Sequence, residues 1–146
     1  MKDNQTITQF LNIKDFPFEI KDKNGNLIYL EDSDGYWEKG EYNDQGKKIY
    51  CETATGYWTK YEYNDQGKEI FHETSTGYWA KREHDDKGNM IYYETSNVYW
   101  EKCEYNEQSK EIYFEDSNGY WEKRDYDERG KVICCKNSNG VIMERC

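Results

Sequence analysis

The five tryptophans of this chain recur at one constant interval of 21 residues, and each follows a tyrosine. The first pair, Tyr36 and Trp37, opens the phrase Tyr-Trp-x-Lys-x-Glu-Tyr, which ends at Tyr42. A fixed period of this length is the signature of a repeat architecture, in which each repeat packs only against its neighbours. The sequence therefore predicts an aromatic ladder made of Trp37, Trp58, Trp79, Trp100 and Trp121.

Each repeat divides into two strands and two turns. In the first full repeat, residues 36–42 and 47–52 are rich in the aromatic and β-branched residues that favour strands. Residues 43–46, Asn-Asp-Gln-Gly, are typical of a type I turn closed by a left-handed glycine and a bulge. No helical period persists. The predicted fold is all-β: an elongated, twisted antiparallel meander of about six 21-residue β-hairpin repeats.

The two ends of the array depart from the pattern. Residues 1–15 do not repeat and are expected to form an N-terminal arm or cap, and residues 16–146 one domain, the hairpin array. Phe16 stands at the tryptophan position of a degenerate first strand, which Pro17 confines to a sheet edge. Residues 141–145 are expected to form the last strand. Residues 6–13 are expected to form either a short helical turn or an arm, with apolar contacts from Ile7, Phe10, Leu11 and Ile13.

Alternation along a strand assigns its side chains to two faces. Trp37, Lys39 and Glu41 share the face that repeats almost unchanged, so we expect it to be structural, with Trp packed over neighbouring Ile and Lys paired with Glu across strands. The opposite face varies and is either solvent-exposed or a binding surface. One repeat has Val98 in place of a turn glycine, and because a left-handed conformation is costly for valine, that turn is expected to change type.

The charge of the chain narrows its partners. Acidic residues outnumber basic ones by 30 to 20, for a net charge of −10. Direct binding to nucleic acid or to an anionic membrane is not expected, because phosphate binding needs clustered Lys and Arg. A basic partner protein or a cationic ligand fits the charge. Acidity could equally serve only to keep an exposed sheet soluble, and both interpretations stay open.

The five cysteines are odd in number and form no Cys-x-x-Cys motif, and no signal peptide is recognised. This predicts free thiols in a reducing, cytoplasmic setting, the host cytoplasm if the gene is carried by a phage. Cys51 and Cys135 share a repeat position with His72 and two aromatic residues, so they are interpreted as small apolar side chains. No catalytic motif is present. The chain is expected to be a non-enzyme without metal or cofactor.

Two segments resemble a known repeat family. Residues 42–47, Tyr-Asn-Asp-Gln-Gly-Lys, and residues 126–131, Tyr-Asp-Glu-Arg-Gly-Lys, resemble the Tyr-Asp-x-x-Gly-Lys/Arg core of RHS/YD-type repeats. The resemblance covers roughly residues 16–142 and implies β-hairpins joined into a continuous curling sheet. Short Gly-Tyr-Trp arrays also look like small repeat proteins of phages and mobile elements, which implies an anti-defence role such as an anti-CRISPR protein. A second similarity, to choline-binding cell-wall repeats, implies a cation-binding module.

Three functions follow as hypotheses. The first is an inhibitor whose periodic acidic turns imitate a nucleic-acid backbone and occupy the basic groove of a CRISPR effector or another nuclease. The second is a module whose aromatic side chains cage a small cation. The third is a structural repeat that self-assembles, with a homodimer formed by edge pairing. The first hypothesis predicts partner contacts at Asp32, Asp34, Asp44, Asp65, Asp86, Glu107, Asp116, Asp127 and Glu128.

Overall fold

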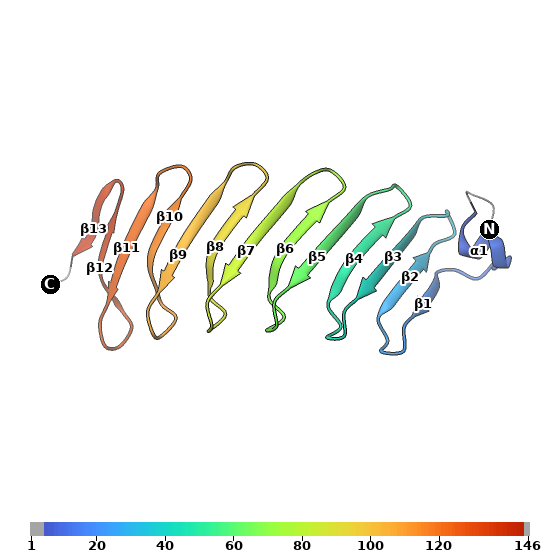
Figure 1. Cartoon of the computed structure of the whole chain (residues 1–146), viewed down its shortest axis with the longest axis horizontal. Coiled ribbons are helices and arrows are strands. Elements are labelled where there is room, and N and C mark those ends of the chain that lie inside the picture. The colour runs from blue at the N-terminus through green and yellow to red at the C-terminus, as the bar shows by residue number, and fades with distance from the viewer. Residues whose placement is uncertain (1–4, 145–146) are drawn as a thin grey trace. The chain divides into compact units, whose positions relative to one another are not determined.

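The computed structural model describes residues 5–144, with side chains as far as residue 140. By its contacts the chain forms two compact units. The first unit runs to Glu62 and includes residues 73–76; the second contains residues 63–72 and continues from Gly77. Within each unit the strands are antiparallel and follow one another in chain order (Figure 1). The predicted all-β antiparallel hairpin meander is confirmed.

The first unit begins with one short helix. It contains α1 (Ile7–Leu11), β1 (Phe18–Lys21), β2 (Leu27–Glu31), β3 (Trp37–Tyr42), β4 (Lys48–Thr53) and most of β5 (Trp58–Tyr63). Each of these strands pairs antiparallel with the next. The edge strand β1 starts two residues later than the repeat pattern predicts, so Phe16 and Pro17 precede it.

The second unit is made of strands throughout. β6 (Glu69–Thr74) contributes residues to both units. It is followed by β7 (Trp79–His84), β8 (Met90–Thr95), β9 (Trp100–Tyr105), β10 (Glu111–Asp116), β11 (Trp121–Tyr126), β12 (Val132–Asn137) and β13 (Gly140–Glu144). The last strand is thus found within one residue of its predicted start, and Arg145 lies outside the described residues.

The hairpin turns have the predicted type. The Gly46 N–H donates to the Asn43 carbonyl at 2.9 Å, the Gly46 φ is 73°, and the register shifts by one residue beside Tyr42. These are the marks of a type I turn followed by a left-handed residue and a bulge. In turns of this kind the side chain of the first residue accepts two backbone N–H groups. For example, Asn43 Oδ1 accepts from the N–H groups of Gln45 and Lys47 at 3.0 and 2.9 Å.

The turn at Val98 does not change type, and that expectation was wrong. The Val98 φ is 67°, and its N–H still donates to the Thr95 carbonyl, at 3.1 Å. Two further bonds hold the turn, from Thr95 N–H to the Tyr99 carbonyl at 2.9 Å and from Ser96 N–H to the Trp79 carbonyl at 3.0 Å. These bonds hold the backbone in the left-handed region despite the β-branched side chain, which is 82% exposed.

Three of the four apolar side chains that are buried in the described residues lie on the variable face, which corrects the expectation that this face is either solvent-exposed or a binding surface. Ala80, Cys103 and Cys135 are at most 7% exposed, whereas the lysines of the repeating face are exposed. Small residues on the variable face lie opposite large ones, as Cys103 does opposite Phe114. Aromatic rings on neighbouring strands also meet there, as Phe114 and Tyr120 do at 6.1 Å. Variation from repeat to repeat therefore reflects packing.

The N-terminal helix binds the sheet through polar contacts. Thr8 is 3% exposed, and its hydroxyl donates to Glu31 at 2.5 Å while its N–H donates to the same carboxylate at 3.2 Å. Of the residues predicted to make apolar contacts, Phe10 and Leu11 are 57% and 55% exposed, whereas Ile7 and Ile13 are half-buried. A five-residue helix is too short to present a long apolar stripe to the sheet. Its hydrogen bonds to the buried Glu31 carboxylate therefore determine how it docks.

Candidate functional site

We define the ladder face as the repeating face, which carries Trp37, Lys39, Glu41 and their equivalents. The indole of Trp37 stacks on the ring of Tyr29, with centroids 6.4 Å apart and planes at 18°. Trp79 stacks on Phe71 in the same way, at 6.4 Å and 26°. Trp37 and Trp79 therefore pack on aromatic rings of the preceding strand. The two rings of the first pair meet because they lie on the same face in diagonal positions, since Tyr29 pairs with Lys39 and Trp37 pairs with Glu31.

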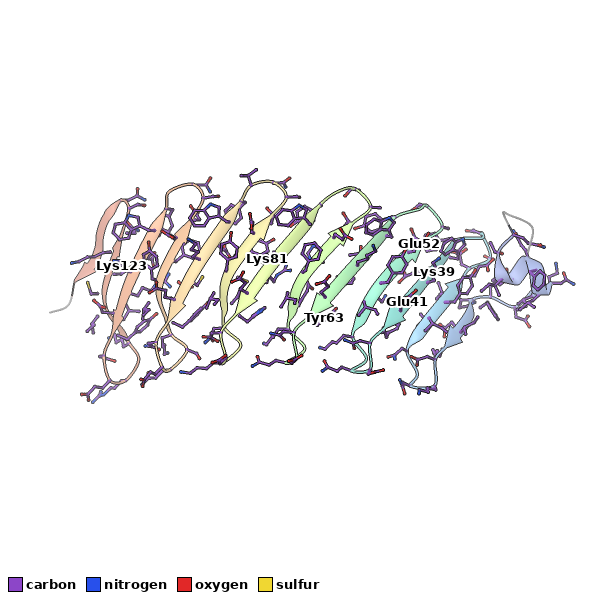
Figure 2. The ribbon with its side chains drawn as sticks, in the orientation of Figure 1. Lys39, Glu41, Glu52, Tyr63, Lys81 and Lys123 are labelled. Atoms are coloured by element: carbon purple, nitrogen blue, oxygen red, sulfur yellow. The ribbon has the colours of Figure 1, made fainter. Side chains whose placement is uncertain are left out.

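Lysines of the ladder face pair with glutamates across strands, as predicted. Lys39 lies 2.6 Å from Glu52, and Lys102 lies 3.7 Å from Glu115. Figure 2 shows Lys39 and Glu52 together over β3 and β4. The hydrogen bond between them raises the pKa of Lys39 and holds the pKa of Glu52 below its usual range. Both groups stay charged at neutral pH, so neither has the intermediate pKa of a general acid or base.

The same lysines lie over aromatic rings. The Nζ atoms of Lys60 and Lys102 are each 5.0 Å from the centroid of a tryptophan, Trp58 and Trp100 respectively. Lys123 lies 5.4 Å from the ring of Tyr113. An ammonium at this distance is attracted to the face of the ring by a cation–π interaction. The arrangement that a small cationic ligand would use is thus occupied by the protein's own side chains.

Three of the predicted partner-binding residues have a structural role. Asp32, Asp116 and Asp127 are the first residues of their turns and are half-buried. Each Oδ1 accepts two backbone N–H groups, at 2.8–3.2 Å in all three. These carboxylates hold the turns in shape, and half of their hydrogen-bonding capacity is used within the chain.

The other six predicted residues are exposed at the turn tips: Asp34, Asp44, Asp65, Asp86, Glu107 and Glu128. The structure adds a second set, which the sequence pattern had assigned to the structural ladder. The side chains of Glu41, Glu62, Glu83, Glu104 and Asp125 are all exposed, and each stands three residues before a turn acid. That i, i+3 spacing was the signal that could have revealed them.

We call the two sets together, without Asp34, the acidic row. In the first unit it comprises Glu41, Asp44 and Glu62; in the second, Asp65, Glu83, Asp86, Glu104, Glu107, Asp125 and Glu128. Within the described part of the chain, Glu83 is the one member with an ion pair, 2.7 Å from Lys81. Two members, Glu104 and Asp125, line a depression of about 360 Å³ together with Tyr113 and Lys123. The row can therefore receive cationic side chains.

The described residues do not support a metal site or a reactive thiol. No group of three or more His, Cys, Asp or Glu side chains there could hold a metal ion. The four cysteines among them are unpaired, and Cys146 lies outside that range. Burial and nearby carboxylates raise the pKa of Cys51 and Cys135, so these thiols stay protonated and unreactive. No helix within residues 5–144 is long and apolar enough to cross a membrane.

Comparison with known proteins finds similarity in structure alone. No protein-family model matches the sequence, and no curated protein matches it significantly. The crystal structure of TcdB2-TccC3 matches with a TM-score of 0.61 and 14% identity, over 84% of this chain and 8% of that one. The Photorhabdus luminescens Tc holotoxin pore matches with a TM-score of 0.54 and 14% identity, over 94% and 10%.

A third match, TcdB2-TccC3-Cdc42, has a TM-score of 0.55 and 14% identity over 88% of this chain and 9% of that one. The protein thus spans no more than about a tenth of the chains it matches. At such identity the likeness concerns the fold and nothing further. What the comparison establishes is that this chain has an RHS-like β-hairpin repeat fold.

Proposed function

We propose that this protein is a non-enzymatic interaction module that binds a basic partner protein through its acidic row. The supporting observation is that exposed carboxylates, almost all without an ion pair, recur with every full hairpin. Unpaired surface charges of one sign steer an oppositely charged partner and favour its correct orientation. Because these carboxylates stand on strands and tight turns, little ordering is needed when a partner binds.

Among the five full repeats, which carry the acidic row, the negative charge is highest in one. Residues 99–119 contain six carboxylates and two lysines, so their net charge of −4 is a large share of the total of −10. Their exposed members are Glu104 and Glu107. Residues 120–140 contain four carboxylates and five basic residues, for a net charge of +1. We therefore place the strongest contact with a basic partner at β9 and the turn that follows it.

The narrower hypothesis is an inhibitor of the anti-CRISPR type that mimics nucleic acid. Two strands span about 10 Å of sheet, and over that distance duplex DNA carries about six charges. A hairpin of the acidic row offers two exposed carboxylates, and its turn also carries a lysine, as Lys47 and Lys68 show. The charge density is several times too low for close mimicry. It fits a partner with a modest basic surface, and mimicry stays a prediction.

Two other functions are less well supported. The small-cation cage is disfavoured because lysines already lie over the rings of the ladder face. A structural role gains some support from the similarity to parts of much longer chains, and it predicts a homodimer formed by edge pairing, which light scattering would detect. A cytoplasmic location is part of the proposal, supported by the unpaired cysteines of residues 5–144.

The test uses a decalysine peptide as a basic probe, titrated against the full chain at several salt concentrations. Binding should weaken steeply between about 50 and 200 mM salt, because the contacts are exposed charges. The double variant Glu104→Gln, Glu107→Gln should weaken binding severalfold. The matched control is the double variant Asp15→Asn, Glu19→Gln, which removes two exposed carboxylates outside the acidic row. Binding that is insensitive to salt, or equally reduced in the control, would refute the proposal.

The anti-CRISPR version has its own test. A CRISPR effector incubated with the protein should lose DNA cleavage, and short duplex DNA should compete with the protein for the effector. Retained cleavage at a large excess of the protein would remove this version and leave the basic-partner proposal standing.

A further inference from the structure

One hydrogen bond recurs between neighbouring hairpins. The N–H of the second residue in a turn donates to the carbonyl of the tryptophan 17 residues earlier. The distance is 2.9 Å from Ser75 to Trp58 and 3.0 Å from Ser96 to Trp79. Three further turns repeat the bond, at Ala54, Ser117 and Ser138. Each of these turns is thus hydrogen-bonded to the start of the strand that pairs with the one leading into the turn.

The first such turn lacks this bond. Ser33 occupies the equivalent position, and the residue 17 places earlier is Phe16. Because Phe16 precedes β1, its carbonyl does not take the tryptophan's place, and the Ser33 N–H has no acceptor within the described part of the chain. One backbone donor of the repeating pattern is therefore available to an outside acceptor.

A pocket of about 400 Å³ lies beside this donor, within the first unit. Its lining residues come from α1, the segment that leads into β1, and the turn between β2 and β3. Its volume falls in the range of small-ligand pockets. The lining residues include Thr8, Asn12 and Ile13 from the cap and Ser33 and Asp34 from the turn. The pocket occupies the place that a preceding tryptophan strand would fill.

The lining of this pocket is acidic and partly apolar. Glu31, Asp32 and Asp34 contribute three carboxylates, against one ammonium from Lys14. Asp34 is exposed, whereas Glu31 is 1% exposed and already accepts hydrogen bonds from Thr6, Thr8 and Tyr29. The negative charge thus calls for a cationic occupant, and Asp34 is the carboxylate placed to pair with it.

Apolar surface lies at the same end of the first unit. Phe16 lines the pocket and is 37% exposed, and Ile13 lines it beside Phe16. Phe10 and Leu11 on α1 are 57% and 55% exposed. These residues fall within seven positions of one another in a chain that exposes few large apolar side chains. An apolar surface with an acidic rim fits a basic peptide that carries an aromatic residue.

We propose that this pocket binds a short extended segment of a partner protein, in which an aromatic residue adjoins Lys or Arg. A carbonyl of the segment accepts the Ser33 N–H, as the tryptophan carbonyls do in the later hairpins. The aromatic ring packs against Ile13 and Phe16, and the basic side chain pairs with Asp34. This site shares no residue with the acidic row and goes beyond the function proposed for it.

The experiment titrates the peptide acetyl-Arg-Trp-Arg-amide into the full ¹⁵N-labelled protein and follows the amide resonances. The Ser33 amide proton should move downfield and saturate, because it gains an acceptor. The amides of Ser75 and Ser96 are the internal controls and should not move, since their acceptors are already in place. Acetyl-Arg-Ala-Arg-amide, which lacks the ring, should bind at least several times more weakly.

Two variants separate the contacts. Ser33→Pro removes the N–H at a turn position where proline is well tolerated, and it should weaken binding about fivefold, the usual contribution of one hydrogen bond. Asp34→Asn should weaken binding of the Arg-containing peptide more than binding of the same peptide with neutral Gln in place of Arg. Thermal unfolding verifies that both variants fold, and Asp65→Asn, which is remote in sequence and lies in the second unit, is the control.

Three results would overturn the proposal. The first is an unmoved Ser33 amide at millimolar peptide, and the second is equal binding by Ser33→Pro. The third is a Ser33 amide that is already hydrogen-bonded in the free protein and that shifts when residues 1–4 are deleted. That last result would show that the chain's own N-terminal segment fills the pocket.

Discussion

Val98 provides the sharpest test of how the hairpins are held together. Its backbone is left-handed, with φ at 67°, in a position that glycine fills at Gly56, Gly77 and Gly119. We predict that Val98→Gly stabilises the protein and that Gly119→Val, one repeat later, destabilises it by a similar amount. An added Cβ at Gly119 would meet no atom within 4 Å, so the exchange measures backbone conformation without a steric clash.

The magnitude follows from two opposing terms. A left-handed conformation costs a residue with a Cβ about 1–2 kcal/mol, and a β-branched residue belongs at the upper end of that range. Glycine lowers the free energy of unfolding by about 0.4–1 kcal/mol, because it makes the unfolded chain more flexible. The net change in the free energy of unfolding is therefore about 1 kcal/mol in each direction. For a chain of this length the melting temperature should shift by about 2–4 °C.

Urea unfolding followed by tryptophan fluorescence measures both variants. The midpoint should rise for Val98→Gly and fall for Gly119→Val, with an unchanged slope, since neither substitution alters the surface exposed on unfolding. A Val98→Ala variant should fall between valine and glycine.

The reasoning fails if Gly119→Val destabilises the protein while Val98→Gly leaves it unchanged or weakens it. That pattern would mean that the Val98 side chain makes a stabilising contact that its 82% exposure does not suggest. It would point to a partner or a second copy at this turn.

Three further predictions concern other parts of the chain. Asn89→Lys should destabilise the protein by at most about 1 kcal/mol, the cost of moving a lysine chain off its preferred rotamer, and adding Ser109→Gly should restore it, in a double-mutant cycle by urea unfolding. The reason is that Lys110 lies 3.0 Å from where a Cβ on Gly130 would be, whereas the shorter Asn89 leaves room for Ser109 and hydrogen-bonds to it at 3.1 Å. Burial alone would raise the pKa of Glu31, but hydrogen bonds from Thr6, Thr8 and Tyr29 outweigh it and hold that pKa below the ordinary value of about 4.3. The stability from Glu31 should therefore be complete above about pH 4.3 and be lost as the pH falls through the lowered pKa, and Glu31→Gln should flatten this part of a pH–stability curve. Cys103 and Cys135 should be alkylated slowly by iodoacetamide at neutral pH, because burial raises their pKa and leaves them 7% exposed. Mass spectrometry of the native protein measures the rate, and alkylation as fast as that of a free thiol would contradict the prediction.

The sequence alone determined the fold of this protein. The 21-residue interval, the alternation along the strands and the Asn-x-x-Gly turns specify hairpins because each is a local rule that fixes backbone direction within a few residues. The pairing of lysine with glutamate followed from the same register. The resemblance of residues 42–47 to an RHS/YD core also agrees with the fold shared with Tc toxin chains.

Only the tertiary structure decided which carboxylates are available. Asp32 and Asp44 were both predicted to contact a partner, but the first accepts two backbone N–H groups of its own turn while the second is exposed. The alternation along the strand assigned Glu41 to a face but could not show that its carboxylate makes no ion pair. Cross-strand ion pairs join residues that are distant in sequence, such as Lys39 and Glu52, so no local pattern shows which carboxylates are left without one. For the same reason, the pocket beside Ser33 exists because one strand starts two residues late, which no single repeat could reveal.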